Sequence, residues 1–166
     1  LDTGFEIFEG IIIPAGQYEF EQFCIYAGFA DHRKVSVKAD YCGGEFFDGD
    51  QTAAGAELLW RPNPHFKFAA RYQVNEIELP YGDFETRLIS LRADVAFSNK
   101  WSWENFVQYD NVSYGLGINS ILRYAPRAGR EVVFVVNQEY VDTLRDRNFD
   151  RVYSDMTFKI TYTFRF

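Results

Sequence analysis

Large apolar residues alternate with polar residues along the last stretch of the chain, MTFKITYTFRF, at positions 156–166. A period of two is the pattern of a β-strand with two different faces. In a sheet surrounded by water, six successive apolar positions on one face would be out of place up to the chain end, where strands usually fray. The alternation therefore predicts a strand whose apolar face meets a solvent other than water.

Segments with the same period, separated by turn residues, follow one another along the whole chain, and helical periodicity is absent. Most are about nine to twelve residues long, which exceeds an average soluble strand and suits a tilted strand that crosses a bilayer. The pattern predicts about ten strands, at residues 3–9, 18–29, 35–43, 53–61, 66–75, 86–97, 101–109, 114–124, 131–140 and 154–166.

The connections between these segments alternate between short and long. Short connections are predicted at 31–34, 62–65, 98–100 and 125–129, and long ones at 10–17, 44–52, 76–84 and 141–153, with 110–113 brief on the long side. Outer-membrane barrels join their strands by short periplasmic turns and longer outer loops, so the alternation favours that architecture. The last strand would then end on the periplasmic side, and its aromatic end resembles the signal by which the barrel-insertion machinery recognises its substrates.

Alternate positions of the predicted strands separate an apolar face from a charged face. The apolar face carries more rings than the interior of a small soluble barrel can hold, so it is expected to face lipid while the charged face lines the interior. The candidate lumen-lining residues are Lys38, Asp40, Glu57, Lys67, Arg71, Arg92, Asp94, Glu104, Arg123, Lys159 and Arg165. The chain thus predicts an all-β, antiparallel transmembrane β-barrel of the outer-membrane type, closed by itself or part of a larger barrel.

Aromatic residues are concentrated beside the predicted connections. All three tryptophans lie next to short turns and several tyrosines lie near the long connections, which is the layout of the two aromatic girdles of a membrane barrel. The candidate girdle residues on the short-turn side are Trp60, Trp101, Trp103, Tyr124 and Phe166.

The composition agrees with this interleaved pattern. Aromatic residues make up 19% and charged residues 25%, with a mean hydropathy of −0.28. No apolar run reaches the roughly 18 residues of a membrane helix, which excludes a helical membrane protein. The net charge of −7 opposes binding to nucleic acid. We expect the protein in the outer membrane of a Gram-negative bacterium, with the lipid bilayer, the barrel-insertion machinery and a protein at the outer loops as partners.

The two cysteines fall on neighbouring predicted strands. If 18–29 and 35–43 form a hairpin about 31–34, a register in which paired residue numbers sum to 66 places Cys24 opposite Cys42. In an oxidising compartment this register allows a cross-strand disulfide, and the alternative is two free thiols.

Several stretches carry a family resemblance. They are FETRLISLRADVAFSNKWSWENFVQYDNVSYGLGINSILRYAPRAGREVVFVVNQEY (84–140), IPAGQYEF (13–20), GGEFFDGD (43–50) and RPNPHFKFAARYQVNEIELPYGDF (61–84). They resemble the C-terminal part of a family of large, poorly characterised outer-membrane proteins that carry a carbohydrate-binding-like β-sandwich before the barrel. The resemblance implies that residues 1–166 are a single barrel domain or the C-terminal portion of one, cut from a longer protein. Any glycan-binding role of the family would then lie outside these residues.

Candidate chemistry is sparse. The only histidines, His32 and His65, fall in predicted short turns, where an imidazole cannot reach a nucleophile of the candidate interior, so we expect no enzyme and no cofactor. Glu45, Asp48 and Asp50 supply hard oxygen ligands of the kind that calcium accepts, but they also suit a solvated Asp-Gly turn. We therefore predict no metal, with these three acids as the one candidate group.

The interleaved charges of the candidate interior are able to pair across neighbouring strands, which leaves two functions open. A porin-like channel or transport-associated barrel would use them to line an aqueous path. A membrane anchor or surface assembly module would use them as a satisfied plug with a structural role. A soluble ligand-binding barrel is the third alternative.

Overall fold

The computed structural model describes residues 1–166 except 31, 144, 146–147 and 164–166. All regular secondary structure in the described part is β-strand, and every strand pairing in it is antiparallel, which confirms the predicted all-β antiparallel fold. None of these residues forms a helix long and apolar enough to cross a membrane.

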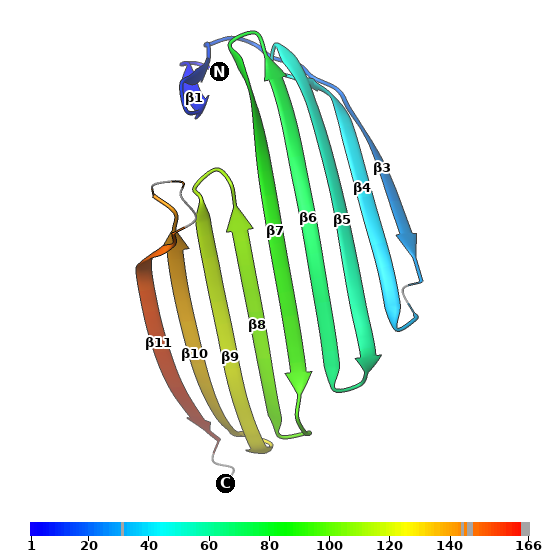
Figure 1. The fold of residues 1–166 in the computed structure, drawn as a ribbon, viewed down its shortest axis with the longest axis vertical. Coiled ribbons are helices and arrows are strands. Elements are labelled where there is room, and N and C mark those ends of the chain that lie inside the picture. The colour runs from blue at the N-terminus through cyan, green and yellow to red at the C-terminus, as the bar shows by residue number, and fades with distance from the viewer. Residues whose placement is uncertain (31, 144, 146–147, 164–166) are drawn as a thin grey trace.

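Nine strands form one sheet in which each strand pairs with its neighbours in sequence (Figure 1). They are β3 (Gln22–Phe29), β4 (Val35–Phe46), β5 (Gly49–Asn63), β6 (Phe66–Leu79), β7 (Gly82–Ala96), β8 (Trp101–Asp110), β9 (Gly115–Arg127), β10 (Arg130–Val141) and β11 (Asp150–Tyr162). The order is an up-and-down meander without crossovers. Strands of up to 15 residues exceed the usual five or six, as the long periodic segments predicted.

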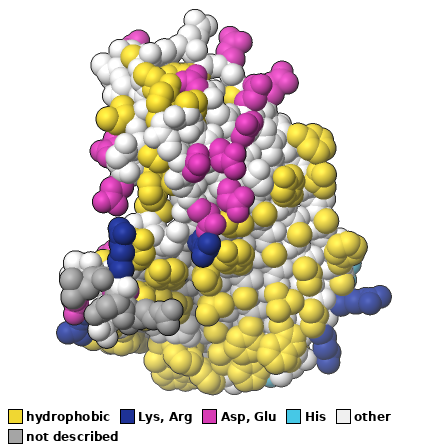
Figure 2. All heavy atoms as spheres, turned by 45° about the horizontal axis from the view of Figure 1, so that its top comes forward, with side chains coloured by type: hydrophobic (Ala, Val, Ile, Leu, Met, Phe, Trp, Pro, Cys, Tyr) yellow, Lys and Arg dark blue, Asp and Glu magenta, His cyan; other side chains and the backbone are white. Residues whose placement is uncertain are grey.

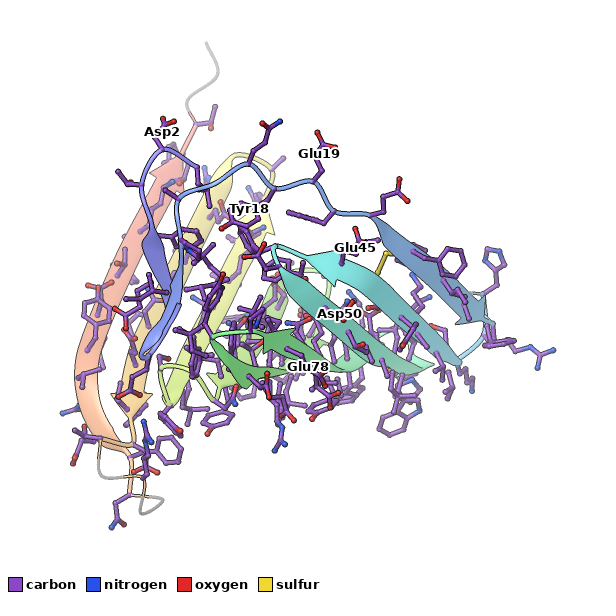
Figure 3. All side chains as sticks on the ribbon, turned by 90° about the horizontal axis from the view of Figure 1, so that it is seen from above. Asp2, Tyr18, Glu19, Glu45, Asp50 and Glu78 are labelled. Atoms are coloured by element: carbon purple, nitrogen blue, oxygen red, sulfur yellow. A yellow bond between two sulfur atoms is a disulfide. The ribbon has the colours of Figure 1, made fainter. Side chains whose placement is uncertain are left out.

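The sheet curves into an arch with a concave and a convex face, as the view from above shows (Figure 3). Closing a barrel requires hydrogen bonds between its first and last strands. In the described part of the chain β3 pairs with β4 alone and β11 with β10 alone. The described residues therefore form an open sheet, and of the two alternatives predicted, closure by this chain itself is not found.

Two connections that were predicted as long loops are mostly strand. Most residues of the predicted loop 44–52 belong to β4 and β5, and most of the predicted loop 76–84 belong to β6 and β7. Only two residues remain in each turn. Phe47 in the first turn has a positive φ angle of 53°, and Gly82, the first residue of β7 directly after the second turn, has one of 142°. Both angles help the chain to reverse its direction. The strands extend because their inner positions are apolar and have a partner to pack against.

That partner is a hairpin formed by β1 (Phe5–Phe8) and β2 (Ile11–Ile13), which is a separate two-stranded sheet. The prediction of 3–9 as a strand of the main sheet and of 10–17 as a loop was therefore wrong. The hairpin lies within the opening of the arch at one end, beside Tyr18 (Figure 3). We call this the hairpin end, and we call the opposite end, where β5–β6, β7–β8 and β9–β10 are joined by turns, the basal end.

The hairpin holds the hydrophobic core of the described residues. Ile11, Ile13, Ile77 and Leu79 are each at most 7% exposed, and Ile13 is fully buried. Rings surround this cluster: Phe8 stacks on Phe84 with centroids 4.5 Å apart, and Phe46 meets Phe47 edge to face at 4.7 Å. The core thus joins the hairpin to the inner face of the sheet and leaves the rest of the arch without one.

The convex face is apolar and exposed. The residues assigned to the apolar face by alternation account for most of the exposed large hydrophobic side chains, among them Phe23, Phe29, Leu58, Trp60, Leu91, Trp103, Met156, Phe158 and Ile160. Figure 2 shows hydrophobic side chains spread over the lower part of the visible surface, with acidic side chains gathered toward the hairpin end. A band of this size on an isolated domain marks a surface that meets another apolar phase or partner.

Candidate functional site

The described candidate lumen-lining residues converge on the concave face of the sheet, where the strand register brings opposite charges together. On the β4–β6 side, the Arg71 guanidinium lies 3.1 Å from the Asp40 carboxylate and 3.9 Å from the Glu57 carboxylate. Lys38 lies opposite Glu57 in the register. Three strands thus contribute to one charged group, with the side chains of Asp40 and Arg71 each about one-third exposed or less.

The middle of the concave face carries a second group. Lys67 of β6 lies 3.3 Å from Asp94 of β7, which also accepts from Arg92 at 2.9 Å. Arg92 in turn lies 3.5 Å from Glu104 on β8. Because Asp94 and Glu104 are directly opposite each other, they would repel without these cations. The four residues thus balance their charges while all but Asp94 stay 42% exposed or more.

A third pair lies further along the sheet. Arg123 of β9 lies 2.9 Å from Glu131 of β10, a residue outside the set of candidate lumen-lining residues. Lys159 lies on the same face, because it pairs with Val133, which pairs with Arg123. Arg165, the last candidate lumen residue, lies outside the described residues. The structure therefore places ten of the eleven candidates on one face and gathers most of them into ion-paired groups.

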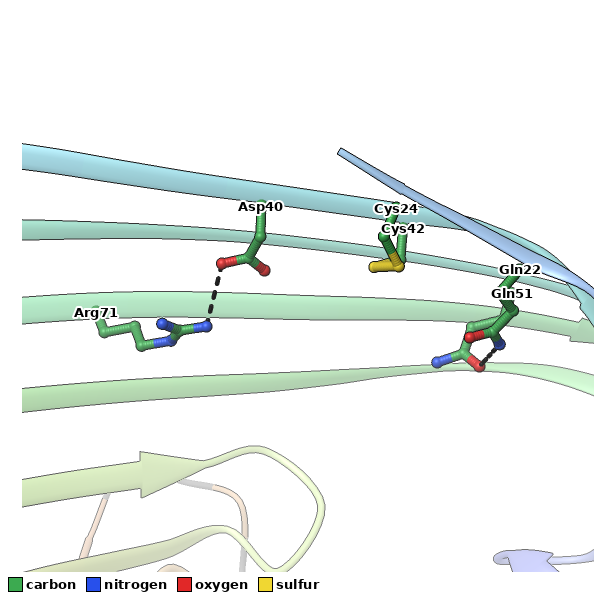
Figure 4. The surroundings of a disulfide bond; sticks show 6 residues. All are labelled: Gln22, Cys24, Asp40, Cys42, Gln51 and Arg71. Atoms are coloured by element: carbon green, nitrogen blue, oxygen red, sulfur yellow. Dashed lines mark hydrogen bonds and ion pairs between the residues drawn. A yellow bond between two sulfur atoms is a disulfide. The ribbon is translucent and has the colours of Figure 1, made fainter. Parts of the chain in front are cut away.

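The concave face also carries the Cys24–Cys42 disulfide between β3 and β4, in the register in which residue numbers sum to 66. Figure 4 shows that the disulfide, the Asp40–Arg71 pair and the Gln22–Gln51 amide pair all project to the same side of the sheet. The Gln22 amide donates to Gln51 at 3.1 Å across the intervening strand. β3 and β4 are thus joined covalently at the edge of the sheet, where β3 has only one strand neighbour.

The convex surface at the hairpin end is acidic. Consecutive pairings align Glu45, Asp50, Glu78 and Asp83 in one row across β4–β7, and Figure 3 labels the first three. The candidate calcium group, Glu45, Asp48 and Asp50, is not gathered: the Asp48 carboxylate instead accepts from the Tyr81 hydroxyl at 2.8 Å. Among the described residues no three His, Cys, Asp or Glu side chains are placed to hold a metal ion.

Two tyrosines at the hairpin end have shifted titration. The hydrogen bond to Asp48, supported by partial burial and by the charge of that carboxylate, raises the pKa of Tyr81. Burial among the neighbouring rings, with a contribution from Asp48, raises the pKa of Tyr18. Both phenols therefore stay neutral over a wider pH range than a free tyrosine.

The hairpin is also tied to the far side of the arch. Arg145, in the connection between β10 and β11, lies 3.5 Å from Glu9 at the tip of the hairpin. The same guanidinium stacks 4.5 Å above the centre of the Tyr114 ring, just before β9. The hairpin thus touches both flanks of the concave face at this end, through its core on β4–β7 and through Arg145 near β9.

The candidate girdle residues lie at the basal end. Trp101 stacks on Tyr124 with ring centroids 4.4 Å apart, and Trp60 stacks on Phe68 at 5.4 Å. Trp103 donates from its indole nitrogen to the Ser120 hydroxyl at 2.9 Å. Phe166 lies outside the described residues. His65 is also at this end, with Nδ1 2.8 Å from the carbonyl oxygen of Ala96, so both histidines lie in basal connections away from the concave face.

Three features of this face were not found from the sequence: Glu131, the glycines that make room for charged side chains, and the hairpin that covers one end. The strand register sets the first two, with a bulge between Arg130 and Val132 in the case of Glu131, and alternation alone does not supply it. Comparison with protein-family models, with curated proteins and with solved structures returns no match. Function is therefore inferred from the geometry and chemistry of the two faces of the sheet.

Proposed function

We propose that this chain forms part of the wall of an outer-membrane β-barrel whose concave face lines an aqueous path for solutes. One observation carries the proposal: the two faces of one long-stranded sheet have opposite chemistry, with exposed rings and aliphatic chains on the convex side and ion-paired groups on the concave side. A soluble sheet gains stability by burying its apolar face, whereas a bilayer is the solvent that this face suits.

The exposure of the charged groups favours a path over a sealed plug. A structural ion-pair plug would be dry, since the cost of burying charges is offset only by close pairing. In this open sheet, Arg92, Glu104 and Lys67 are each between 42% and 49% exposed although they are paired. Side chains that are paired and still hydrated suit the wall of an aqueous channel, where they bias which ions pass.

A second function, a membrane anchor or surface assembly module, is favoured by one specific observation. The hairpin packs on the inner face at one end with a fully buried Ile13, as a fixed cover would. An anchor would need no open path, and its partners would bind at the exposed hairpin end. Substitutions on the concave face would then change stability alone, and substitutions in the β4–β5 or β6–β7 turns would abolish binding.

Membrane integration is tested first, by expressing the barrel to which this chain contributes in a Gram-negative bacterium and extracting membranes with high salt, alkaline carbonate or detergent. We expect release by detergent alone. Release by salt alone would overturn the proposal and support a soluble ligand-binding sheet.

Transport is tested by single-channel recording of the protein in planar bilayers. Arg92→Ala removes a cation that bridges Asp94 and Glu104, so we expect a shift toward cation selectivity. Arg87→Ala is the matched control because Arg87 pairs with Glu85 on the convex side at the hairpin end. No conductance from a membrane-integrated protein would contradict the channel and favour the anchor.

A further inference from the structure

A hollow of about 370 Å³ lies on the concave face toward the hairpin end of β8–β11. Two cross-strand rows form its walls and floor. One row contains Phe106, Asn119 and Asn137, and the next contains Gln108, Gly117, Glu139 and Tyr153. Both rows lie on the same face as Arg92, because Arg92 is paired with Phe106. The hollow therefore adjoins the ion-paired group of Arg92 and lies within the same proposed path.

Gly117 leaves the floor of this hollow open. A Cβ added at Gly117 would meet no atom closer than the Gln108 carbonyl oxygen at 4.0 Å, and its φ is not in the left-handed region. Neither the backbone nor the packing of neighbouring strands thus requires glycine here. Glycine within a strand weakens it and often marks a bulge, a tight bend, or a place that a ligand or another backbone approaches closely. The register has no bulge at Gly117. The absence of a side chain at this point is best explained by what fits above it.

The polar groups around the floor both donate and accept hydrogen bonds. Gln108, Asn119 and Asn137 each carry a carbonyl oxygen and an NH₂ group, and Glu139 adds an acceptor. The Asn119 amide donates to the Asn137 carbonyl oxygen at 2.5 Å, which holds the two amide planes relative to each other. Hydroxyl groups are the ligand groups that match this set, because each hydroxyl also donates one hydrogen bond and accepts others.

The aromatic rings and the charges around the hollow restrict the class of ligand further. Phe106 and Tyr153 line the hollow and are 38% and 53% exposed, so they offer apolar surface to a ligand. Asp110 and Glu139 line it as well, and no lysine or arginine among the described residues does, so an anionic ligand is disfavoured. A few convergent polar groups beside apolar surface, in a volume of this order, are typical of small-molecule sites.

We infer that this hollow is a binding subsite for a neutral polyhydroxylated ligand, a mono- or disaccharide, whose hydroxyls meet the amides while its C–H faces lie against the two rings. The inference names the class of solute for the path proposed above and rests on that proposal for its role in transport. Binding itself is measured separately from membrane integration, so each is able to fail alone.

The test is saturation-transfer NMR on the intact barrel that contains this chain, in detergent micelles. Maltose, cellobiose and N,N′-diacetylchitobiose are the neutral probes, and glucuronate is the anionic probe. Gly117→Val fills the floor with a residue that strands favour, and Tyr153→Ala removes one ring without changing the floor. Gln51→Ala is the matched control, because it removes an amide from the concave face on β5, far along the sheet.

We expect saturation transfer to at least one neutral probe and none to glucuronate. Both pocket variants should weaken binding at least about tenfold, or about 1.4 kcal/mol, while Gln51→Ala binds as the unaltered protein does. The inference is overturned by no transfer to any neutral probe, by equal transfer to glucuronate, or by unchanged binding in Gly117→Val and Tyr153→Ala. Circular dichroism establishes that each variant keeps its strand content.

Discussion

The carboxylate of Asp40 occupies the space above Gly55, its direct partner in the register. A Cβ at position 55 would stand 2.5 Å from Asp40 Oδ2, closer than side chains approach each other in proteins. This space lets Asp40 reach across β5 to Arg71 on β6, although β4 and β6 are not neighbours. The missing side chain at Gly55 thus allows an ion pair between β4 and β6 across the intervening strand β5.

Gly55→Ala should separate this pair. The methyl group displaces the Asp40 carboxylate, and we expect the free energy of unfolding to fall by about 1 kcal/mol, since overpacking outweighs the backbone gain of alanine. Urea unfolding of the folded protein in detergent measures the change.

Gly117→Ala is the control on the same face, because its added Cβ has open space. Alanine there should raise the free energy of unfolding by about 0.5 kcal/mol through a less flexible unfolded chain. Equal effects of the two alanines would contradict a special role for Gly55.

The disulfide should stabilise the edge of the sheet. Cys24 and Cys42 close a loop with a sequence separation of 18, and a loop of this length predicts a loss of about 3 kcal/mol in Cys24→Ser/Cys42→Ser. Amide hydrogen exchange should speed up first in β3, which has one strand neighbour. A reductant should give the unaltered protein the same unfolding midpoint as the double variant, and a midpoint insensitive to reductant would refute the prediction.

Much of the fold followed from alternation, because a strand's two faces repeat every second residue whatever the tertiary structure. The assignment of Asp40, Arg71 and Arg92 to one face required no more than that. The register of Cys24 with Cys42 followed from the place of one turn. These features depend on local geometry and were therefore predictable.

The features that were missed depend on contacts between distant segments. Residues 76–79 continue β6 because Ile77 and Leu79 pack against the hairpin, and Pro80 beyond them made the stretch look like a loop. The isoleucines of 11–13 looked like loop residues because a three-residue strand is too short to show a period. The Arg123–Glu131 pair needed the register after a bulge between Arg130 and Val132, which no pattern reveals.

The acidic row at the hairpin end should lower the free energy of unfolding. Glu78 lies between Asp50 and Asp83 in the register, and like charges directly opposite each other repel. Glu78→Gln should therefore raise the free energy of unfolding by about 0.5 kcal/mol, and added salt should stabilise the unaltered protein more than the variant. Glu19→Gln, in the segment before β3, serves as the control. Equal salt responses in all three proteins would show that the row does not interact.

Tyr81 should make the hairpin end sensitive to alkali. Its hydrogen bond to Asp48 raises its pKa above the ordinary value of about 10, so the folded state favours the neutral phenol. The resulting stabilisation is complete below the pKa of the unfolded chain and is lost as pH rises through the higher folded pKa. Ultraviolet titration should show raised tyrosinate transitions for Tyr81 and Tyr18. Tyr81→Phe should remove one of them, and Asp48→Asn should shift the transition of Tyr81 down. A transition that Asp48→Asn leaves in place would exclude the hydrogen bond as its cause.

Substitution of Ile13 tests whether the hairpin is a fixed cover of the concave face or one that can separate from it. It is fully buried, whereas its neighbour Ile12 is 58% exposed on the other side of β2. Ile13→Ala removes core contacts worth about 3 kcal/mol, and the small hairpin has few other contacts to compensate. Because the nine-stranded ladder does not include the hairpin, we expect Ile13→Ala to release residues 1–21 to limited proteolysis while β5–β10 keep their amide protection. Ile12→Ala is the control and should leave the hairpin protected from proteolysis. In bilayers the Ile13→Ala protein should conduct more than the Ile12→Ala protein, because loss of the packed hairpin uncovers the hairpin end of the path. Proteolytic release without any rise in conductance would mean that the hairpin does not obstruct the path, and loss of protection throughout the sheet would mean that the hairpin core is required by the whole fold.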